Sequence, residues 1–172
     1  QSLGGYPEFV PDAFRMEQKT GHNPSRLRYE DISARIGLDK TSAGRGTAIF
    51  DFNNDGHLDV AIAAAQGGIN LYRNNGDGTF TDVSINSGLD ECVNGFVLAA
   101  GDYDNDGRMD FLLSGAEQTT GRPQLLLWRN TGSGFSNVTQ SVAPGLPGII
   151  DGSLTWGDFD NDGRLDFLLT GL

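Results

Sequence analysis

A nine-residue acidic segment occurs three times in this chain and constrains the fold more than any other feature. The copies read DFNNDGHLD from Asp51, DYDNDGRMD from Asp102 and DFDNDGRLD from Asp158, and their starts are 51 and 56 residues apart. Each copy has an acid or amide at positions 1, 3, 5 and 9 and a glycine at position 6. Carboxylates this close repel one another, so a folded chain must compensate their charge.

Two further sequence landmarks keep the same spacing. YEDISARIGL starts at Tyr29, FTDVSINSGL at Phe80 and FSNVTQSVAPGL at Phe135. Between the acidic segments lie LYRNNGDGTF from Leu71 and LLWRNTGSGF from Leu126. Landmarks in a fixed order define an internal repeat of about 50 residues, a length typical of propeller blades, solenoids and arrays.

The second repeat predicts four short strands separated by glycine-containing turns. Their expected ranges are 96–102, 109–114, 124–130 and 135–139. The second strands of the three repeats contain VAIAAA, FLLSG and FLLTG, which are continuously apolar and therefore suit strands covered on both faces. No segment keeps a helical period of apolar residues. The fold class that we predict is all-β, with β-propeller blades of four antiparallel strands.

The repeats also predict how the chain is divided. Residues 1–27, which include Pro7, Pro11 and Pro24, have no clear period and are expected to form a tail or linker, with one helical turn near 13–19. Residues 28–172 are expected to form the propeller segment. Its blades are expected at about 43–84 and 95–139, with a partial blade at 151–172. Residues 28–36 are expected to be the fourth strand of a preceding or closing blade, so the segment is expected to be part of a larger propeller.

The acidic segments have the composition of calcium loops. Side chains at positions 1, 3, 5 and 9 and the backbone carbonyl of position 7 can surround one ion, and calcium takes six to eight oxygen ligands. The glutamate that an EF-hand needs at position 12 is absent, since that position is Ile62, Leu113 or Leu169. The predicted ligands of three calcium ions are Asp51, Asn53, Asp55, His57 and Asp59, then Asp102, Asp104, Asp106, Arg108 and Asp110, and finally Asp158, Asp160, Asp162, Arg164 and Asp166.

The alternative for each segment is a plain hairpin turn, because Asn-Gly and Asp-Gly are strong turn signals. A turn needs no carboxylate at position 9, and the same four positions recur in all three copies. These two facts favour the metal loop. Asn53 replaces an aspartate at position 3, so we expect the first site to bind calcium most weakly.

The net charge of −11 limits the partners of the chain. Nucleic acid and anionic membrane surfaces are excluded as favourable partners. The three loops contain 11 of the 18 aspartates, and three divalent cations would offset six of these negative charges. The apolar runs are too short for a membrane span.

Residues outside the loops give little sign of catalysis. His22 and His57 are the only histidines and are expected at the surface, and Cys92 follows two acids that would disfavour a thiolate. Tyr72, Trp128 and Trp156 could stack on sugars, but we expect them to pack between blades.

Together, DFNNDGHLDV, DYDNDGRMDF, DFDNDGRLDF and the intervening LYRNNGDGTFTDV resemble the FG-GAP repeats, also called VCBS repeats. The resemblance includes ASPIC-type bacterial proteins and, more distantly, integrin alpha subunits. It implies a β-propeller, commonly with seven blades, and calcium bound in blade loops by the residues given above. It also implies a location outside the cytoplasm, which can be extracellular, at the cell surface or periplasmic.

Two classes of function remain open at this point. The first is a calcium-binding, non-catalytic module for adhesion, binding or structure, with a protein or glycan ligand at the cell surface. The second is a lectin, or a scaffold or part of a carbohydrate-active enzyme, that acts on extracellular polysaccharide. The clustered carboxylates all have a metal role and none is paired with histidine or lysine, which favours the first class. Open strand edges predict head-to-tail self-association if the segment occurs alone.

Overall fold

The computed structural model describes residues 29–39, 44–65, 68–89 and 94–171. Contacts divide the chain into two units, Gln1–Asp31 and Ile32–Leu172, and the second unit contains every helix and strand of the described residues. The predicted tail at 1–27, including His22 and the helical turn near 13–19, lies outside the described residues, as does Cys92.

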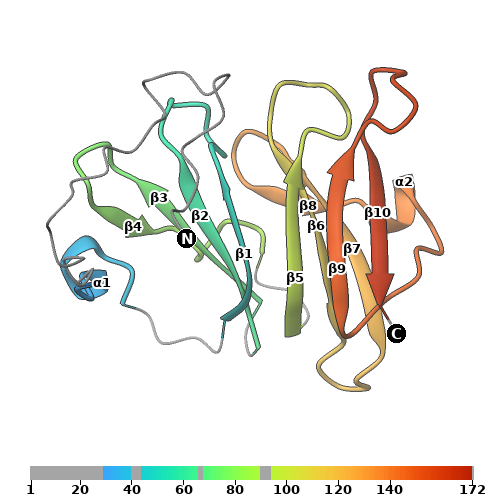
Figure 1. The fold of residues 1–172 in the computed structure, drawn as a ribbon, viewed down its shortest axis with the longest axis horizontal. Helices are drawn as coiled ribbons and strands as arrows, with labels where there is room; N and C mark the ends of the chain where they lie inside the picture. The colour runs from blue at the N-terminus through green and yellow to red at the C-terminus, as the bar shows by residue number, and fades with distance from the viewer. Residues whose placement is uncertain (1–28, 40–43, 66–67, 90–93, 172) are drawn as a thin grey trace, which may run out of the picture. The chain divides into compact units, whose positions relative to one another are not determined.

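The described strands form two four-stranded antiparallel sheets and one two-stranded hairpin, in chain order (Figure 1). Each full sheet is a meander in which consecutive strands are neighbours. The first sheet contains β1 (Gly44–Phe50), β2 (Asp59–Ala64), β3 (Ile69–Asn74) and β4 (Phe80–Asp82), and the second contains β5 (Asn94–Gly101), β6 (Asp110–Ala116), β7 (Pro123–Asn130) and β8 (Phe135–Asn137). The hairpin contains β9 (Gly152–Gly157) and β10 (Asp166–Gly171). The predicted all-β fold of four-stranded antiparallel sheets is confirmed.

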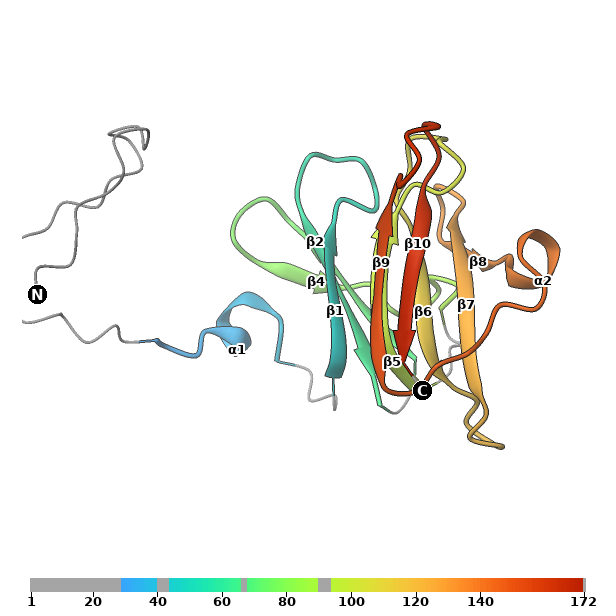
Figure 2. The same ribbon diagram turned by 45° about the vertical axis from the view of Figure 1, so that its right-hand side comes forward.

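Each acidic segment connects the first two strands of its sheet. The last residue of the first strand pairs with position 9 of the loop, as in Phe50 with Asp59, Gly101 with Asp110 and Gly157 with Asp166. The three loops lie at the same end of their sheets, at the top of Figure 1 and Figure 2. The repeat therefore places three similar acidic turns side by side at one end of the sheets.

The central strand β6 is covered on both of its faces. All of its residues are buried, as its continuous apolar sequence predicts. Phe111 packs into a core shared with Phe50 and Ala61 of the first sheet. The next residue, Leu112, packs into a second core with Leu154 of the hairpin. Alternate side chains of one strand thus join the first sheet, the second sheet and the hairpin.

Trp128 and Trp156 pack in these cores, as predicted. Tyr72 and Trp128 are almost completely buried. Trp156 donates a hydrogen bond from Nε1 to the carbonyl oxygen of Ala99 at 3.1 Å and meets the ring of Phe167 edge-on, with the ring centres 5.9 Å apart. The contacts of Trp128 and Trp156 assign these two rings to packing between sheets, whereas Tyr72 is buried outside both cores.

Two predictions of strand position are corrected by the structure. The expected fourth strand at 28–36 contains instead the helical turn α1 (Ser33–Ile36), and residues 29–32 are in no strand. The turn forms because the Ile32 carbonyl accepts backbone N–H groups at 2.9 and 3.1 Å, and Gly37 ends it with a φ of 84°. Similarly, the strand expected at 135–139 ends at Asn137, and α2 (Thr139–Val142) follows. The Asn137 side chain causes this turn by accepting the N–H and hydroxyl of Thr139.

The repeated segments that begin at Tyr29, Phe80 and Phe135 each end in Gly-Leu, which we call the Gly-Leu landmark. Its glycine allows two backbones to touch. A Cβ atom at Gly37 would lie 2.3 Å from the carbonyl oxygen of Phe80, and one at Gly88 would lie 2.1 Å from that of Phe135. Both contacts are with the first residue of a fourth strand, β4 or β8. Each connecting segment therefore packs on the last strand of the sheet that follows it in the sequence, and only glycine fits there.

Asn130 joins the two sheets and should be important for stability. Its Nδ2 donates to the carbonyl oxygens of Phe52 at 2.7 Å and Met109 at 3.2 Å, and the side chain is nearly inaccessible. We predict that Asn130→Ala lowers the free energy of unfolding by about 2–4 kcal/mol, because the backbone carbonyls of two half-buried residues lose their donor. Asn74, its half-buried counterpart, donates to Leu58 within its own sheet, so Asn74→Ala should cost only about 1 kcal/mol. Equal losses in urea unfolding would contradict this assignment.

Candidate metal-binding loops

The carboxylate at position 1 organises every loop. Asp51 accepts the backbone N–H of Asp55 at 3.1 Å and that of Gly56 at 2.8 Å. The same pair of hydrogen bonds recurs at Asp102, with lengths of 3.0 and 2.8 Å, and at Asp158, with lengths of 3.1 and 2.9 Å. A single side chain therefore folds the chain back on itself in all three copies, as in an Asx turn.

Position 4 is an asparagine in each loop and adopts a left-handed backbone conformation. The φ angles of Asn54, Asn105 and Asn161 are 56°, 55° and 58°. Asparagine tolerates this region better than most residues with a side chain. The glycines at position 6 also have positive φ. Position 4 was not among the residues predicted to be functional, although asparagine recurs there in all three copies.

The aspartate at position 9 ties the loop to the sheet. Asp59, Asp110 and Asp166 each accept the N–H of position 2, at 3.0, 3.2 and 3.1 Å. Asp59 and Asp110 also accept, at 2.7 Å each, the N–H of the asparagine that ends the third strand. Both carboxylates are completely buried. Burial raises the pKa of Asp59, and it raises the pKa of Asp110 to about 6 despite the hydrogen bonds.

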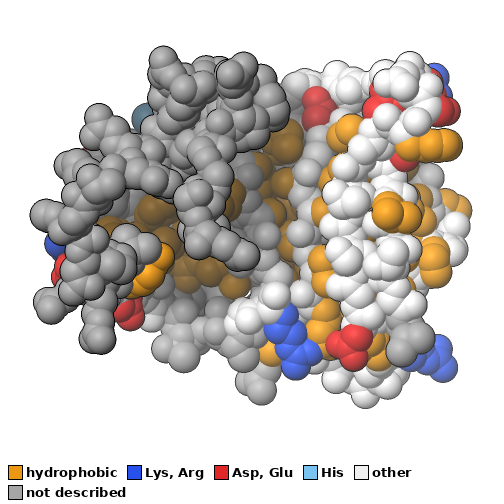
Figure 3. Space-filling view, in the orientation of Figure 1, with side chains coloured by type: hydrophobic (Ala, Val, Ile, Leu, Met, Phe, Trp, Pro, Cys, Tyr) orange, Lys and Arg blue, Asp and Glu red, His pale blue; other side chains and the backbone are white. Residues whose placement is uncertain are grey.

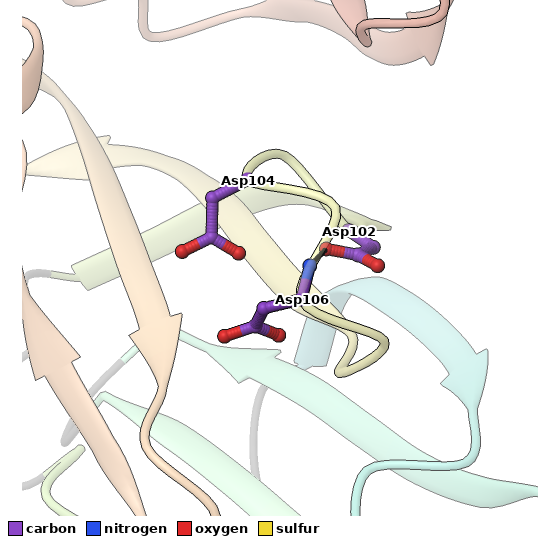
Figure 4. A group of neighbouring side chains, drawn as sticks. All are labelled: Asp102, Asp104 and Asp106. Atoms are coloured by element: carbon purple, nitrogen blue, oxygen red, sulfur yellow. Dashed lines mark hydrogen bonds between the residues drawn. The ribbon is translucent and has the colours of Figure 1, made fainter.

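The second and third loops each bring three carboxylates together. In each group, one oxygen from every residue lies within 4.8 Å of the others, the spacing that one cation would need. The side chains of Asp102, Asp104 and Asp106 project from the loop between β5 and β6 (Figure 4). The corresponding group in the third loop is Asp158, Asp160 and Asp166. Asp110 and Asp162, which were predicted as ligands, fall outside these groups, and the described residues of the first loop form no such group.

Arginines compensate part of the charge of the second loop. Arg129 of β7 places Nε 2.7 Å from Asp104 Oδ2 and Nη2 3.0 Å from Asp106 Oδ2, and Arg108 also pairs with Asp106. Burial alone would raise the pKa of Asp106, but the N–H of Arg108 and the guanidinium of Arg129 outweigh it and lower that pKa. The sequence did not predict that Arg108 and Arg129 would pair with the carboxylates of the loop.

In the first loop, an amide rather than a guanidinium group compensates part of the carboxylate charge. Nδ2 of Asn53 donates to Asp55 Oδ2 at 2.8 Å, and this bond, with the N–H of His57, lowers the pKa of Asp55. Arg73 stands at the position of Arg129 in the repeat, yet it is in no ion pair among the described residues. The change from aspartate to asparagine at position 3 therefore coincides with an arginine that forms no ion pair with the loop and acts on Asp55 only as the weakest of the causes that lower its pKa.

Position 7 takes part through its backbone. The N–H groups of His57, Arg108 and Arg164 donate to the position-5 carboxylate at 2.9, 3.0 and 2.8 Å. This bond fixes the backbone of position 7, while the side chain at that position can vary. The His57 side chain is exposed. Calcium ligation by the position-7 carbonyls, like ligation by the side chains of the predicted sets, stays a prediction.

The described helices are one turn each, so none could cross a membrane.

The pattern of the FG-GAP-like repeat matches residues 51–113 and 114–169. Cartilage acidic protein 1 of Xenopus tropicalis is 30% identical over 162 residues, which are 91% of this chain and 24% of the relative. The Homo sapiens protein of that name is 27% identical over 97% of this chain and 25% of its own length. The chain thus spans about a quarter of these relatives. Since the repeat pattern covers most of the chain, the chain belongs to the FG-GAP-like repeat family.

Proposed function

We propose that each acidic loop binds one calcium ion and that the chain is a calcium-stabilised binding or structural module outside the cell. The observation that carries this proposal is the repetition of one loop geometry three times at one end of the sheets (Figure 2). In two of the loops, three carboxylates already lie close enough to share a cation. Loop folding without such an ion leaves carboxylates facing one another with incomplete compensation.

The donor atoms favour calcium over other metals. The loops offer carboxylate, amide and carbonyl oxygens, which suit a hard cation with many ligands and a flexible geometry. The position-9 carboxylates accept backbone N–H groups, but each carboxylate oxygen has two lone pairs and can bind an ion as well. The proposed ligand sets remain those given by positions 1, 3, 5, 7 and 9 of the three loops.

The family and its relatives support a place outside the cell. The name of the animal relatives associates them with cartilage and calls them acidic, and this chain has a net charge of −11. Calcium modules outside the cell bind calcium at about 10⁻⁴–10⁻³ M, an affinity that partly neutralised loops can supply. The ligand in this proposal is a protein or a glycan at the cell surface. A glycan array and a protein-capture screen in calcium, each repeated in chelator, would identify its class.

Comparison of equivalent positions supports a longer propeller. Leu112 and Ser114 of β6 are buried on the side of the hairpin, where the Ser114 hydroxyl donates to the Ile149 carbonyl at 2.6 Å. Their equivalents in β10 are Leu168 and Thr170, which are exposed, and Leu168 is 63% accessible. Apolar side chains are visible over β9 and β10 in Figure 3. The third Gly-Leu landmark is also uncovered. A Cβ at Gly145 would meet nothing within 4 Å, whereas Gly37 and Gly88 each contact a fourth strand. Further blades of the same repeat would cover this face.

The opposite face of the first sheet has complementary character. Ile49 and Leu58 are 63% and 59% accessible. Their equivalents in the hairpin, Trp156 and Leu165, pack against Gly101 of the preceding sheet. The exposed face of β10 corresponds to the β6 face that packs on the hairpin, and the exposed face of the first sheet corresponds to the hairpin face that packs on the second sheet. The two exposed faces are therefore suited to pack on each other in a heterologous, head-to-tail contact.

Calcium removal provides the direct test of the metal proposal. We expect a chelator to lower the melting temperature, because an ion at a hundredfold excess over its Kd stabilises by about 2.7 kcal/mol per site. Asp158→Asn should reduce this chelator-dependent shift. The control is Asp77→Asn, since Asp77 lies in the β3–β4 turn and accepts only hydrogen bonds from Thr79. A melting curve that is indifferent to the chelator would overturn the proposal.

The arginine of the second loop should compete with calcium. We predict that Arg129→Gln raises calcium affinity at the second loop by about threefold to tenfold, because Asp104 and Asp106 lose a positively charged neighbour. Arg73→Gln is the matched control and should leave affinity at the first loop nearly unchanged. Isothermal titration of both variants measures this difference. If both substitutions have the same effect, local ion pairing is not the cause.

The exposed face predicts self-association of these 172 residues when they are alone. Leu168→Lys should shift the chain toward monomer, since it places a charge on the exposed apolar face of the proposed contact. Ile85→Lys is the control, because Ile85 is a similarly exposed aliphatic residue outside the sheets. Sedimentation velocity at several concentrations distinguishes the two. A wild-type chain that stays monomeric at every concentration would rule out the head-to-tail contact.

A further inference from the structure

The three loops are connected to one another by asparagine side chains. Nδ2 of Asn54 in the first loop donates to the carbonyl oxygen of Gly107 in the second loop at 2.9 Å. Nδ2 of Asn105 in the second loop donates to the carbonyl oxygen of Gly163 in the third, also at 2.9 Å. Donor and acceptor hold the same loop positions in both cases, position 4 and position 6. One contact therefore repeats along the row of loops.

Each of these contacts joins groups that the position-1 carboxylate already fixes. In the first loop, the peptide that follows Asn54 donates its N–H to Asp51. In the second loop, the glycine that accepts the Asn54 amide donates its own N–H to Asp102 at 2.8 Å. The hydrogen bonds thus run from one position-1 carboxylate, through an asparagine and a glycine, to the next position-1 carboxylate.

The backbone conformation explains why asparagine is needed at this position. Asn54 and Asn105 have φ angles of 56° and 55°, which glycine also adopts freely but most other residues do not. Glycine would supply the conformation without a donor. Asparagine supplies both the conformation and a short amide that reaches the neighbouring loop.

We propose that Asn54 and Asn105 are positioning residues that couple the loops, so that an ion bound in one loop raises the affinity of the next. This inference rests on the calcium binding proposed above. An ion that orders positions 1, 3 and 5 of the first loop also orders Asn54, and the ordered amide holds the Gly107 peptide in the conformation that its own loop needs. A second ion then loses less conformational entropy on binding.

The coupling is reciprocal and of limited size. An ion in the second loop must raise the affinity of the first loop by the same factor. The factor that one hydrogen bond can transmit is about twofold to tenfold. The negative charge of the loops also connects them, but that effect is screened by salt, whereas a hydrogen bond between neighbouring loops is not.

The test is a cycle of substitutions read out separately at each loop. The amides of Gly56, Gly107 and Gly163 each donate to the position-1 carboxylate of their own loop, so their NMR resonances report three calcium titrations in one sample. Asp51→Asn disables the first loop while keeping one oxygen acceptor. Asn54→Gly removes the connecting amide while keeping the left-handed backbone. The titration of Gly107 is then measured in wild type, in each single variant and in the double variant, at high salt.

We expect Asp51→Asn to weaken calcium binding at Gly107 by about twofold to tenfold in the wild-type background and to have no effect in the Asn54→Gly background. Asn161→Gly is the matched control, because the side chain of Asn161 has no hydrogen bond to another loop among the described residues, and it should leave the Gly107 titration unchanged. An equal effect of Asp51→Asn in both backgrounds would overturn the coupling, with calcium binding intact. Glycine resonances that do not respond to calcium at all would instead overturn the proposed function.

Discussion

The hydrogen bonds accepted by the position-9 aspartates are the constraint on which the rest of the structure depends. A carboxylate that is completely buried must be compensated, and Asp59 and Asp110 are compensated by N–H groups from the loop and from the end of the third strand. These bonds fix the acidic turn relative to three strands of its sheet. The loop is therefore part of the sheet rather than an appendage to it, and any ion that stabilises the loop also stabilises the packing below it.

Charge count alone does not rank the three loops. The first loop has one carboxylate fewer than the second, but the second has guanidinium groups of Arg108 and Arg129 on its carboxylates. A cation that binds the second loop must compete with these groups or displace them. The third loop keeps its four aspartates, and Arg164 is in no ion pair among the described residues. Arg129 of the third strand thus alters the charge around the proposed ligands of the second loop, which all come from the first hairpin of that sheet.

Much of the fold followed from the sequence because the repeat samples the same local problem several times. Continuous apolar runs predicted the doubly covered strand β6, and Gly-containing turns placed the hairpins close to where they lie. The errors came where a polar side chain redirects the backbone, as Asn137 does when it ends β8 before Thr139. The contacts of Arg129 and Asn105 could not be predicted, because they depend on the distance between strands and between neighbouring sheets. Recurrence would have singled out position 4, but no rule of composition identifies the glycine carbonyl that it reaches.

The position-4 asparagine and the position-6 glycine have a consequence for how such chains can evolve. Each repeat carries the donor for the loop that follows it and the acceptor for the loop that precedes it. Tandem duplication of the gene segment therefore creates a new junction that is already complementary, with no further substitution required. Deletion of one repeat likewise leaves matching halves. At this contact, a change in the number of repeats therefore needs no compensating substitution, whereas the shared core and the bond from Asn130 to Phe52 set further requirements at the same junction.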